Sequence, residues 1–114
     1  MKDLLRKMDI RRGDIFFIRF DKDKKNISET RAALICSNDI VNEYAQRIVV
    51  APITSNLTRI YSFEYVIKNE FLEGRIMFDQ IRTIDRTYVL NKIHSLSLRD
   101  MNQVDMILKQ ILSI

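Results

Sequence analysis

Apolar and polar residues along the chain alternate or cluster in a way that predicts several short strands. The first strand is expected over Asp14–Phe20, after Gly13, because aromatic and β-branched residues occupy both faces of that segment. Two further apolar runs, Arg31–Cys36 and Arg47–Ile53, predict a second and a third strand. Turn-forming residues lie between them, together with a helical turn around Ile40–Tyr44. The first half of the chain is therefore expected to be mostly strand.

The pattern continues in the second half. From Tyr61 to Lys68, aromatic and aliphatic residues alternate with polar ones such as Glu64, which predicts a strand with one face in water. Gly74 marks a turn. Arg75–Ile84 is expected as a longer or bent strand, and Tyr88–Leu90 as a further short one.

One amphipathic helix is predicted at the C-terminal end. Ser97 and Asp100 resemble the start of a capped helix. The apolar face has helical spacing and comprises Leu98, Met101, Val104, Ile107, Leu108, Ile111 and Leu112. Because no crossover helices separate the strands, the fold class is α+β. We expect a small, strongly curved antiparallel sheet or open barrel with this C-terminal helix.

The size and charge of the chain limit its organisation and partners. With 114 residues we expect a single domain over 1–114, in which residues 1–10 form a basic helical turn or a mobile arm. The chain carries 19 Lys and Arg against 15 Asp and Glu, and the basic residues cluster in Lys2–Arg12 and Lys22–Lys25. Such clusters favour a polyanionic partner, although excess charge also serves solubility.

Cysteine and histidine usage restricts the chemistry. Cys36 is the only cysteine, so an internal disulfide cannot form and a reducing, cytoplasmic compartment is expected. His94 is the only histidine and lies in a distant segment, which favours Cys36 as a small buried side chain over a nucleophile. We expect no metal site and no cofactor. A signal peptide or membrane-spanning helix is also not expected.

The pairing of the second and third strands brings two candidate residues together. If these strands are antiparallel neighbours, setting Cys36 opposite Val49 places Arg31 opposite Thr54 at the open end. A guanidinium can hold a phosphate oxygen bidentately, and a hydroxyl can donate one more hydrogen bond. From this geometry alone, a solvated strand-end charge and a turn hydroxyl remain the simpler interpretation.

Conventional catalytic sets cannot be assembled from this sequence. A single histidine cannot form a two-histidine acid–base site, and the chain has no glycine-rich phosphate loop. The tripeptide Arg12-Gly13-Asp14 matches a cell-adhesion motif, but its place beside a strand makes a chance match the better interpretation.

Several motifs, in this order and spacing, resemble the MazF/PemK (Kid) family of toxin endoribonucleases over nearly the whole chain after residue 10. They are Arg11–Phe17, Arg31 with the apolar run Ala32–Cys36, Ser37–Asp39, Val49–Ser55, Asp79–Asp85 and the terminal helix. The resemblance implies an SH3-like barrel of the CcdB/MazF/PemK type and a homodimer. It also implies metal-independent cleavage of single-stranded RNA by attack of the substrate's own 2′-hydroxyl. The expected protein partner is a small antitoxin.

The resemblance also suggests roles for individual residues. Arg31 matches the family's catalytic arginine and Thr54 its catalytic threonine. Gln80 matches a glutamine of the family, and Asn38 and Arg82 are further candidates for RNA binding. For these three residues, an interpretation as strand-end polar side chains has equal weight. Lys24 and Lys25 are candidates because of their charge.

The chain departs from the family in one segment. Asp21–Thr30 is expected to be a lysine-rich loop instead of a Gly/Ser-rich one, and Ala32 replaces a common proline after Arg31. Glu29 offers a carboxylate for proton transfer, but its spacing differs from that of the family, so the general base is not assigned. Two alternatives remain: a non-catalytic nucleic-acid-binding barrel, and a gyrase-poison type of toxin that acts on a protein target.

Overall fold

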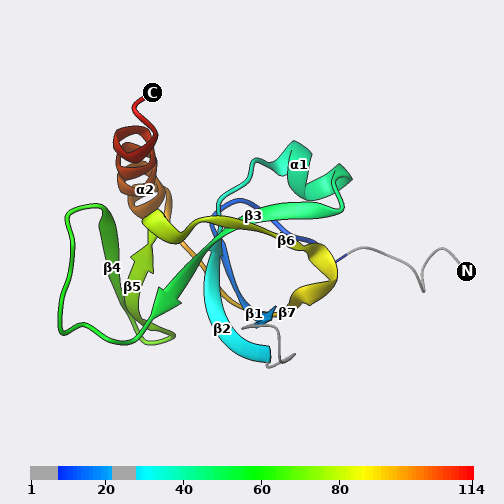
Figure 1. Cartoon of the computed structure of the whole chain (residues 1–114), viewed down its shortest axis with the longest axis horizontal. Helices are drawn as coiled ribbons and strands as arrows, with labels where there is room; N and C mark the ends of the chain where they lie inside the picture. Colours follow the sequence, from blue (N-terminus) through cyan, green and yellow to red (C-terminus); the bar gives the residue numbers. More distant parts are fainter. Residues whose placement is uncertain (1–7, 22–27) are drawn as a thin grey trace, which may run out of the picture.

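A curled antiparallel sheet forms most of the molecule in this computed structural model, which describes residues 8–21 and 28–114 (Figure 1). Within these residues the sheet has seven strands in the order β4-β5-β3-β2-β1-β7, and β6 pairs with β3 off this path. The strands are β1 (Asp14–Asp21), β2 (Ser28–Ile35), β3 (Arg47–Thr54), β4 (Glu64–Lys68), β5 (Glu73–Met77), β6 (Arg82–Asp85) and β7 (Val89–Ser95). The helical segments are α1 (Asp39–Tyr44), the short 3-10 turns η2 (Phe78–Gln80) and η3 (Arg86–Tyr88), and α2 (Leu98–Leu112).

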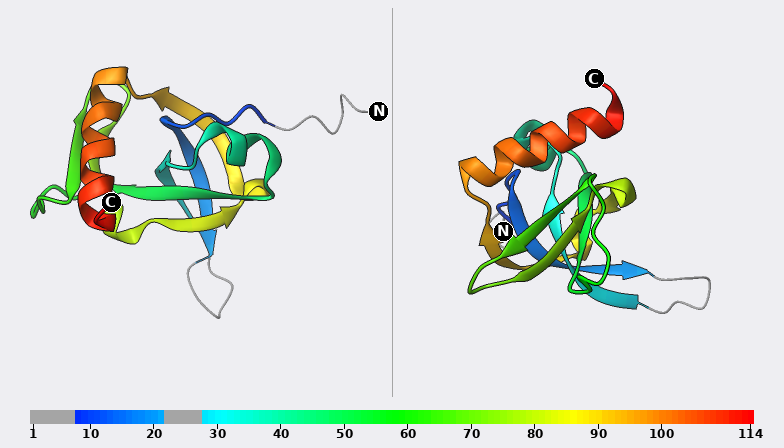
Figure 2. Two further views of the ribbon diagram at one scale, coloured as in Figure 1. Left: turned by 90° about the horizontal axis from the view of Figure 1, so that it is seen from above. Right: turned by 90° about the vertical axis from the view of Figure 1, so that its left-hand side faces the viewer.

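Both faces of the curled sheet are buried. One cluster of buried side chains fills the concave side, and we call it the barrel core: Ile10, Phe16, Ile18, Phe20, Ala33, Ile35, Ile48, Val50, Ile84 and Val89. A second cluster, the helix core, lies on the other face and includes Leu34, Ile53 and Phe78 together with apolar residues of α2. Figure 2 shows α2 running beside β4 on that side of the molecule. The burial of alternate residues on both faces accounts for the near-continuous apolar runs of β1, β2 and β3.

Helix α2 begins as the sequence predicts. The Ser97 hydroxyl accepts a hydrogen bond from the Asp100 backbone N–H at 3.1 Å, which satisfies a donor of the first turn. Val104 is fully buried, and Met101, Ile107, Leu108 and Ile111 pack around the helix core. The expected α+β architecture, a curved antiparallel sheet with a C-terminal helix, is therefore confirmed.

Some of the predicted boundaries are wrong. The Asp21–Thr30 segment is not entirely loop, because β2 already begins at Ser28. Arg75–Ile84 is not one strand, because η2 separates β5 from β6. Strand β5 pairs with both β3 and β4, whereas β6 pairs with β3 alone. Of the predicted arm over 1–10, residues 1–7 lie outside the described part, and Ile10 belongs to the barrel core.

Gly74, predicted to mark a turn, lies inside β5. The turn precedes it, where the Asn69 side chain accepts hydrogen bonds from the backbone N–H groups of Phe71 and Leu72. A Cβ atom at position 74 would lie only 2.7 Å from the Thr54 carbonyl oxygen. Glycine is therefore needed here for the close approach of β5 to the end of β3.

Within residues 8–21 and 28–114, no helix has both the length and the apolar character required to cross a bilayer.

Candidate active-site cleft at the ends of β2 and β3

A cleft of about 520 Å³ lies where β2 begins and β3 ends. We call it the β2–β3 cleft. Arg31 and Thr54 both line it, as do two carboxylates, Glu29 and Glu73. The remaining lining residues are Phe17, Thr30, Ala32, Ile53, Ser55 and Leu72. The cleft thus combines a guanidinium, several hydroxyls and two acids at one strand end.

The register of β2 and β3 explains why Arg31 and Thr54 share this cleft. Leu34 pairs with Ala51 and Ile35 with Val50, and the Cys36 N–H donates to the Val49 carbonyl at 2.8 Å. This is the register that the sequence predicts. The pairing is present from Ile35–Val50 to Ala33–Pro52, and Arg31 and Thr54, each two residues beyond Ala33 and Pro52, both line the cleft.

Strand β3 changes partner between Val50 and Ile53, shortly before Thr54. Its first half pairs with β6, whereas Ile53 and Thr54 pair with Ile76 and Arg75 of β5. Pro52 lies between these two segments, where β3 has β2 as its only neighbouring strand within the described residues. A proline is tolerated there because it has no N–H to contribute to a second ladder.

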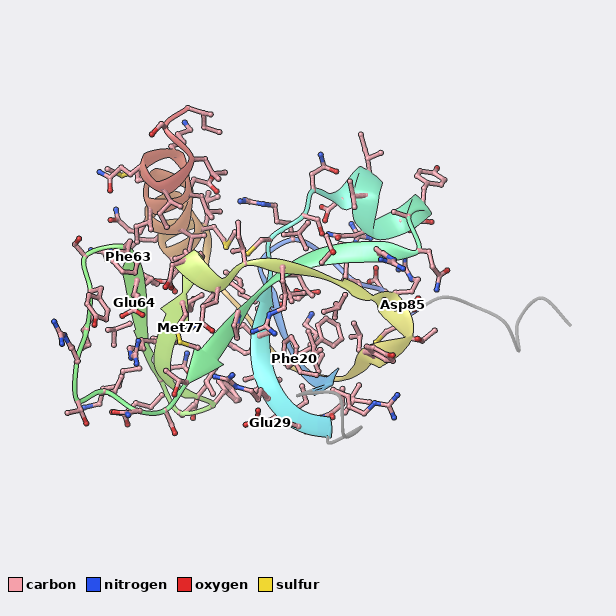
Figure 3. The ribbon with its side chains drawn as sticks, in the orientation of Figure 1. Phe20, Glu29, Phe63, Glu64, Met77 and Asp85 are labelled. Atoms are coloured by element: carbon pink, nitrogen blue, oxygen red, sulfur yellow. The ribbon has the colours of Figure 1, made fainter. Side chains whose placement is uncertain are left out.

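A buried ion pair fixes the loop that follows Thr54. The Arg75 guanidinium binds the carboxylate of Glu64, and the two side chains are only 14% and 2% exposed. Arg75 also donates from Nε to the Asn56 carbonyl at 2.8 Å, and Glu64 accepts from the Tyr61 N–H at 2.9 Å. Both ends of the loop are therefore bound to one ion pair, and Figure 3 labels Glu64 on β4. The burial of Glu64 contradicts the expectation that its side chain lies on the solvent-exposed face of a strand.

Arg31 and Thr54 both have N–H or O–H donors that can bind a ligand. The Thr54 oxygen accepts a long bond from the Asn56 N–H at 3.3 Å, and its O–H finds no acceptor among the described residues. Arg31 is half-buried and has no acidic partner within 8–21 and 28–114. Both groups can therefore donate hydrogen bonds into the cleft.

The structure places the other predicted binding residues elsewhere. Asn38 caps α1, where its side chain accepts from the Val41 N–H at 2.9 Å. Gln80 is exposed on η2 and contacts the Met77 sulfur, and Arg82 lies over the Phe20 ring at 4.8 Å. None of these three lines the β2–β3 cleft. Lys24 and Lys25 lie outside the described residues.

Sequence reasoning missed Glu73 and Ser55 as lining residues, and the Glu64–Arg75 pair. Glu73 reaches the cleft only because β5 crosses next to Thr54, a contact that no local pattern specifies. Ser55 follows Thr54 directly and could have been found from the strand end alone.

The surroundings of Cys36 and His94 indicate structural roles for both side chains. Burial raises the pKa of the Cys36 thiol to about 12, which opposes formation of a thiolate at neutral pH. The His94 ring stacks on Phe71, with ring centroids 5.0 Å apart. In the part of the chain that the structure describes, no group of three or more His, Cys, Asp or Glu side chains is arranged to hold a metal ion.

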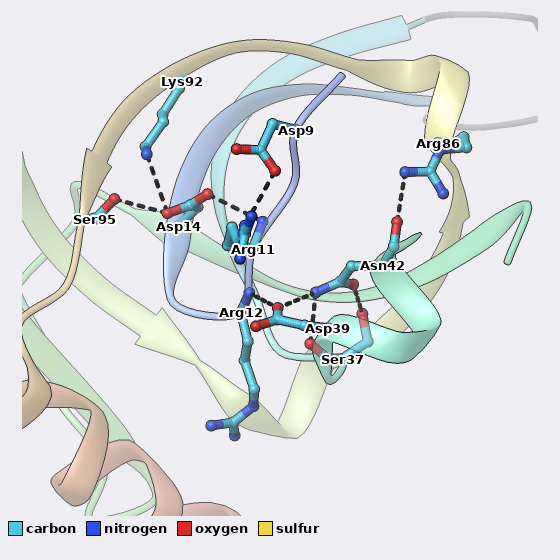
Figure 4. A network of polar contacts seen from close by, with 10 residues as sticks. All are labelled: Asp9, Arg11, Arg12, Asp14, Ser37, Asp39, Asn42, Arg86, Lys92 and Ser95. Carbon is cyan, nitrogen blue, oxygen red and sulfur yellow. Dashed lines mark hydrogen bonds and ion pairs between the residues drawn. The ribbon is translucent and has the colours of Figure 1, made fainter. Parts of the chain in front are cut away.

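Two of the motifs that carry the family resemblance, Arg11–Phe17 and Ser37–Asp39, have structural roles away from the cleft (Figure 4). Buried Asp14 accepts from the Ser95 hydroxyl at 2.7 Å and lies 3.3 Å from the Lys92 ammonium. Asp39 accepts from the Arg12 N–H at 2.7 Å, and the Arg12 guanidinium pairs with Asp105. These contacts attach α1 and α2 to the start of β1. They also occupy Arg12 and Asp14, so the tripeptide is not available as an adhesion motif.

The sequence and fold place this chain among known toxins. Residues 11–112 match the family described as PemK-like, MazF-like toxin of type II toxin-antitoxin system, and the chain belongs to this family.

Individual relatives agree with this assignment. The chain is 29% identical over 110 residues to "Endoribonuclease MazF9" of Mycobacterium tuberculosis, covering 88% of this chain and 93% of the relative. Among solved structures, it is similar to a MazE-MazF crystal structure (Form-II) from Deinococcus radiodurans, with a TM-score of 0.80, 19% identity, and coverage of 92% and 96% of the two chains. An endoribonuclease from Mycobacterial species gives a TM-score of 0.77 with 18% identity and coverage of 95% of both chains.

Proposed function

We propose that this toxin is an endoribonuclease that cleaves single-stranded RNA without a metal ion, with its chemistry in the β2–β3 cleft. The observation that carries the proposal is the joint position of Arg31 and Thr54 in one cleft of a PemK/MazF-family fold. The name of the mycobacterial relative supports the activity. In the proposed role the protein acts as a sequence-specific toxin that cuts mRNA and so inhibits translation and growth.

The proposed reaction is an internal transesterification. The 2′-oxygen of the substrate attacks the adjacent phosphorus, the bond from phosphorus to the 5′-oxygen breaks, and the products are a 2′,3′-cyclic phosphate and a 5′-hydroxyl. One proton leaves the 2′-hydroxyl and one reaches the departing 5′-oxygen. Negative charge grows on the non-bridging oxygens in the transition state, so donors fixed in advance lower the barrier.

Each cleft residue has a role that its chemistry allows. The Arg31 guanidinium can hold two phosphate oxygens and keeps its charge throughout the reaction. The Thr54 hydroxyl can orient the phosphate with one further hydrogen bond. The proton of the 2′-hydroxyl then requires an acceptor, and Glu29 and Glu73 supply carboxylates within the same cleft.

We assign the proton acceptor to Glu29, because it lies on β2 two residues before Arg31, whereas Glu73 lies on the strand beyond Thr54. Replacing Glu29 with Gln is expected to lower the single-turnover rate about a hundredfold and to remove the acidic limb of the pH–rate profile. Glu73→Gln serves as the matched control and should keep both. A normal pH profile in Glu29→Gln, with a changed profile in Glu73→Gln, would reverse the assignment.

The proposed setting is a cytoplasmic homodimer held inactive by a small antitoxin. Support for the antitoxin comes from solved relatives, one of which is described as an endoribonuclease in complex with its cognate antitoxin. Sedimentation of the purified chain at several concentrations tests the dimer, and a single monomeric species at all concentrations would contradict it.

The activity is tested by incubating the purified protein with a long single-stranded RNA in an excess of chelator. Expected products are discrete fragments with cyclic phosphate and 5′-hydroxyl ends, and mapping those ends yields the cleavage motif. A substrate with 2′-deoxyribose at the mapped position should resist cleavage. Intact RNA after incubation with several diverse sequences would favour a non-catalytic binder or a toxin with a protein target.

A further inference from the structure

A second cleft, of about 350 Å³, lies between β6 and β1 beside η3, and it is rich in arginine. We call it the arginine cleft. Arg19 of β1, Arg47 of β3 and Arg82 of β6 line it together with Phe20, Tyr88 and Asp85. Figure 3 shows Phe20 under this part of the sheet and Asp85 at the end of β6. Three guanidiniums from three different strands thus converge on one hollow.

Two of the arginines are held in place by aromatic rings. The Arg19 guanidinium lies 4.9 Å from the centroid of Tyr88, and that of Arg82 lies 4.8 Å from the centroid of Phe20. Stacking orients a guanidinium without using its N–H groups, which remain directed outward. None of the three has an ion-pair partner in the described part of the chain, and all three are exposed.

The one carboxylate in the arginine cleft is already hydrogen-bonded by its surroundings. Asp85 accepts from the Thr87 N–H, the Thr87 hydroxyl and the Gln46 side chain, at 2.9, 2.8 and 2.9 Å. These bonds lower the pKa of Asp85, and the nearby charge of Arg47 lowers it further by a smaller amount. The cleft therefore keeps a surplus of positive charge.

The arginine cleft adjoins the β2–β3 cleft across one strand pair. Arg19 pairs with Thr30 and Phe20 pairs with Glu29, so two residues of the arginine cleft each lie opposite a residue that lines the β2–β3 cleft. Directly paired residues in antiparallel strands lie about 5 Å apart at their Cα atoms. A single strand of nucleic acid bound in the β2–β3 cleft can therefore continue across the paired strands β1 and β2 to the arginine cleft.

We propose that the arginine cleft is a second RNA subsite, in which Arg19, Arg47 and Arg82 bind a phosphate of the substrate away from the scissile bond. This proposal rests on the proposed ribonuclease function. The subsite contributes affinity and positions the strand, and it takes no part in bond cleavage. An acidic peptide is the competing occupant that the charge also permits.

The test compares the full-length double variant Arg19→Ala/Arg47→Ala with the control Lys68→Ala/Arg99→Ala, which removes the same charge from exposed positions outside both clefts. The probes are fluorescein-labelled 2′-O-methyl RNAs of about 4 and about 12 nucleotides, which bind but cannot be cleaved. We expect the Arg19/Arg47 variant to bind the longer RNA about tenfold more weakly, with a salt dependence reduced by about one phosphate contact. Binding of the shorter RNA should change less than twofold.

Two results would overturn the proposal. One is equal binding of the longer RNA by the Arg19/Arg47 variant and by the control. The other is equal weakening for both RNA lengths, which would place the effect in the β2–β3 cleft or in the fold. If RNA binding is unchanged but affinity for an Asp- and Glu-rich peptide falls, the occupant is a peptide and the RNA subsite is wrong. The ribonuclease function is judged separately by cleavage of unmodified RNA by the unaltered protein, so the two proposals can fail independently.

Discussion

At the scale of single residues, the proposed chemistry depends first on Arg31. It lies on β2 and lines the β2–β3 cleft together with Thr54 of β3. Replacing Arg31 with Ala should lower the single-turnover cleavage rate about a hundredfold or more, because a preorganised charge at the phosphate is lost. Arg31→Lys keeps the charge but not the bidentate geometry, so an intermediate rate is expected. A fully active Arg31→Ala protein would remove this residue from the mechanism.

Thr54 allows a nearly isosteric test of a single hydroxyl. Thr54→Val keeps the β-branched shape that suits a strand end but removes the donor. We expect the cleavage rate to fall about a hundredfold while the melting temperature changes little, since the hydroxyl only accepts a long bond from Asn56. The control is Ser55→Ala, which removes the hydroxyl of the next residue along the chain. Normal cleavage by a folded Thr54→Val protein would reduce Thr54 to a structural turn residue.

At the scale of elements, the Glu64–Arg75 pair joins β4, β5 and the loop after β3. Glu64→Gln leaves the Arg75 charge buried without its partner, and we expect the free energy of unfolding to fall by about 3 kcal/mol. The double variant Glu64→Gln/Arg75→Met should recover part of that loss, because no unpaired charge remains. Urea denaturation measures both. A loss below about 1 kcal/mol in Glu64→Gln would mean that water reaches Arg75 and compensates its charge.

The secondary-structure elements also show which features of the fold the sequence predicts and which it does not. β1, β2, β3 and α2 follow from local apolar patterns, because each buries a face that repeats at the period of its own structure. The β2–β3 register also follows, since burial on both faces leaves few alternative alignments. Glu64 was expected in water because alternation cannot reveal a buried partner, and that partner, Arg75, lies on the next strand.

The candidate site is predictable to a similar extent. Arg31 and Thr54 were reached from one register, and they do line one cleft. Asn38, Gln80 and Arg82 were grouped with them by motif, yet they lie at a helix cap, a 3-10 turn and the arginine cleft. Order along the chain cannot distinguish these positions, because the bend at η2 directs β6 away from the β2–β3 cleft.

At the scale of the whole molecule, the barrel core and the helix core stabilise different groups of strands around the β2–β3 cleft. The barrel core closes the curled sheet around β1, β2, β3 and β6, and the helix core presses α2 against β4 and β5. The β2–β3 cleft lies where β3 passes from the first group of strands to the second. The cleft is therefore built on strands from both cores.

Alkaline pH offers a global test of this packing through Cys36. Burial raises the thiol pKa to about 12 in the folded chain, against a usual value of about 8.5 in an unfolded one. Folding therefore favours the protonated thiol of Cys36. Its contribution to the free energy of unfolding is complete below about pH 8.5 and is lost as the pH rises towards about 12. The free energy of unfolding of the unaltered protein should therefore fall more steeply between pH 9 and pH 10.5 than that of Cys36→Ala.

Denaturation curves of both proteins at intervals across that range measure the difference in slope, which cannot exceed about 1.4 kcal/mol per pH unit for one proton. Tyr65 contributes in the same direction in both proteins, because its hydrogen bond to Asp100 raises its pKa to about 12 and ties β4 to α2. The comparison with Cys36→Ala cancels that shared effect. Identical slopes would mean that the thiol ionises in the folded protein near its usual pKa, and the Cys36 side chain would then have to be open to water.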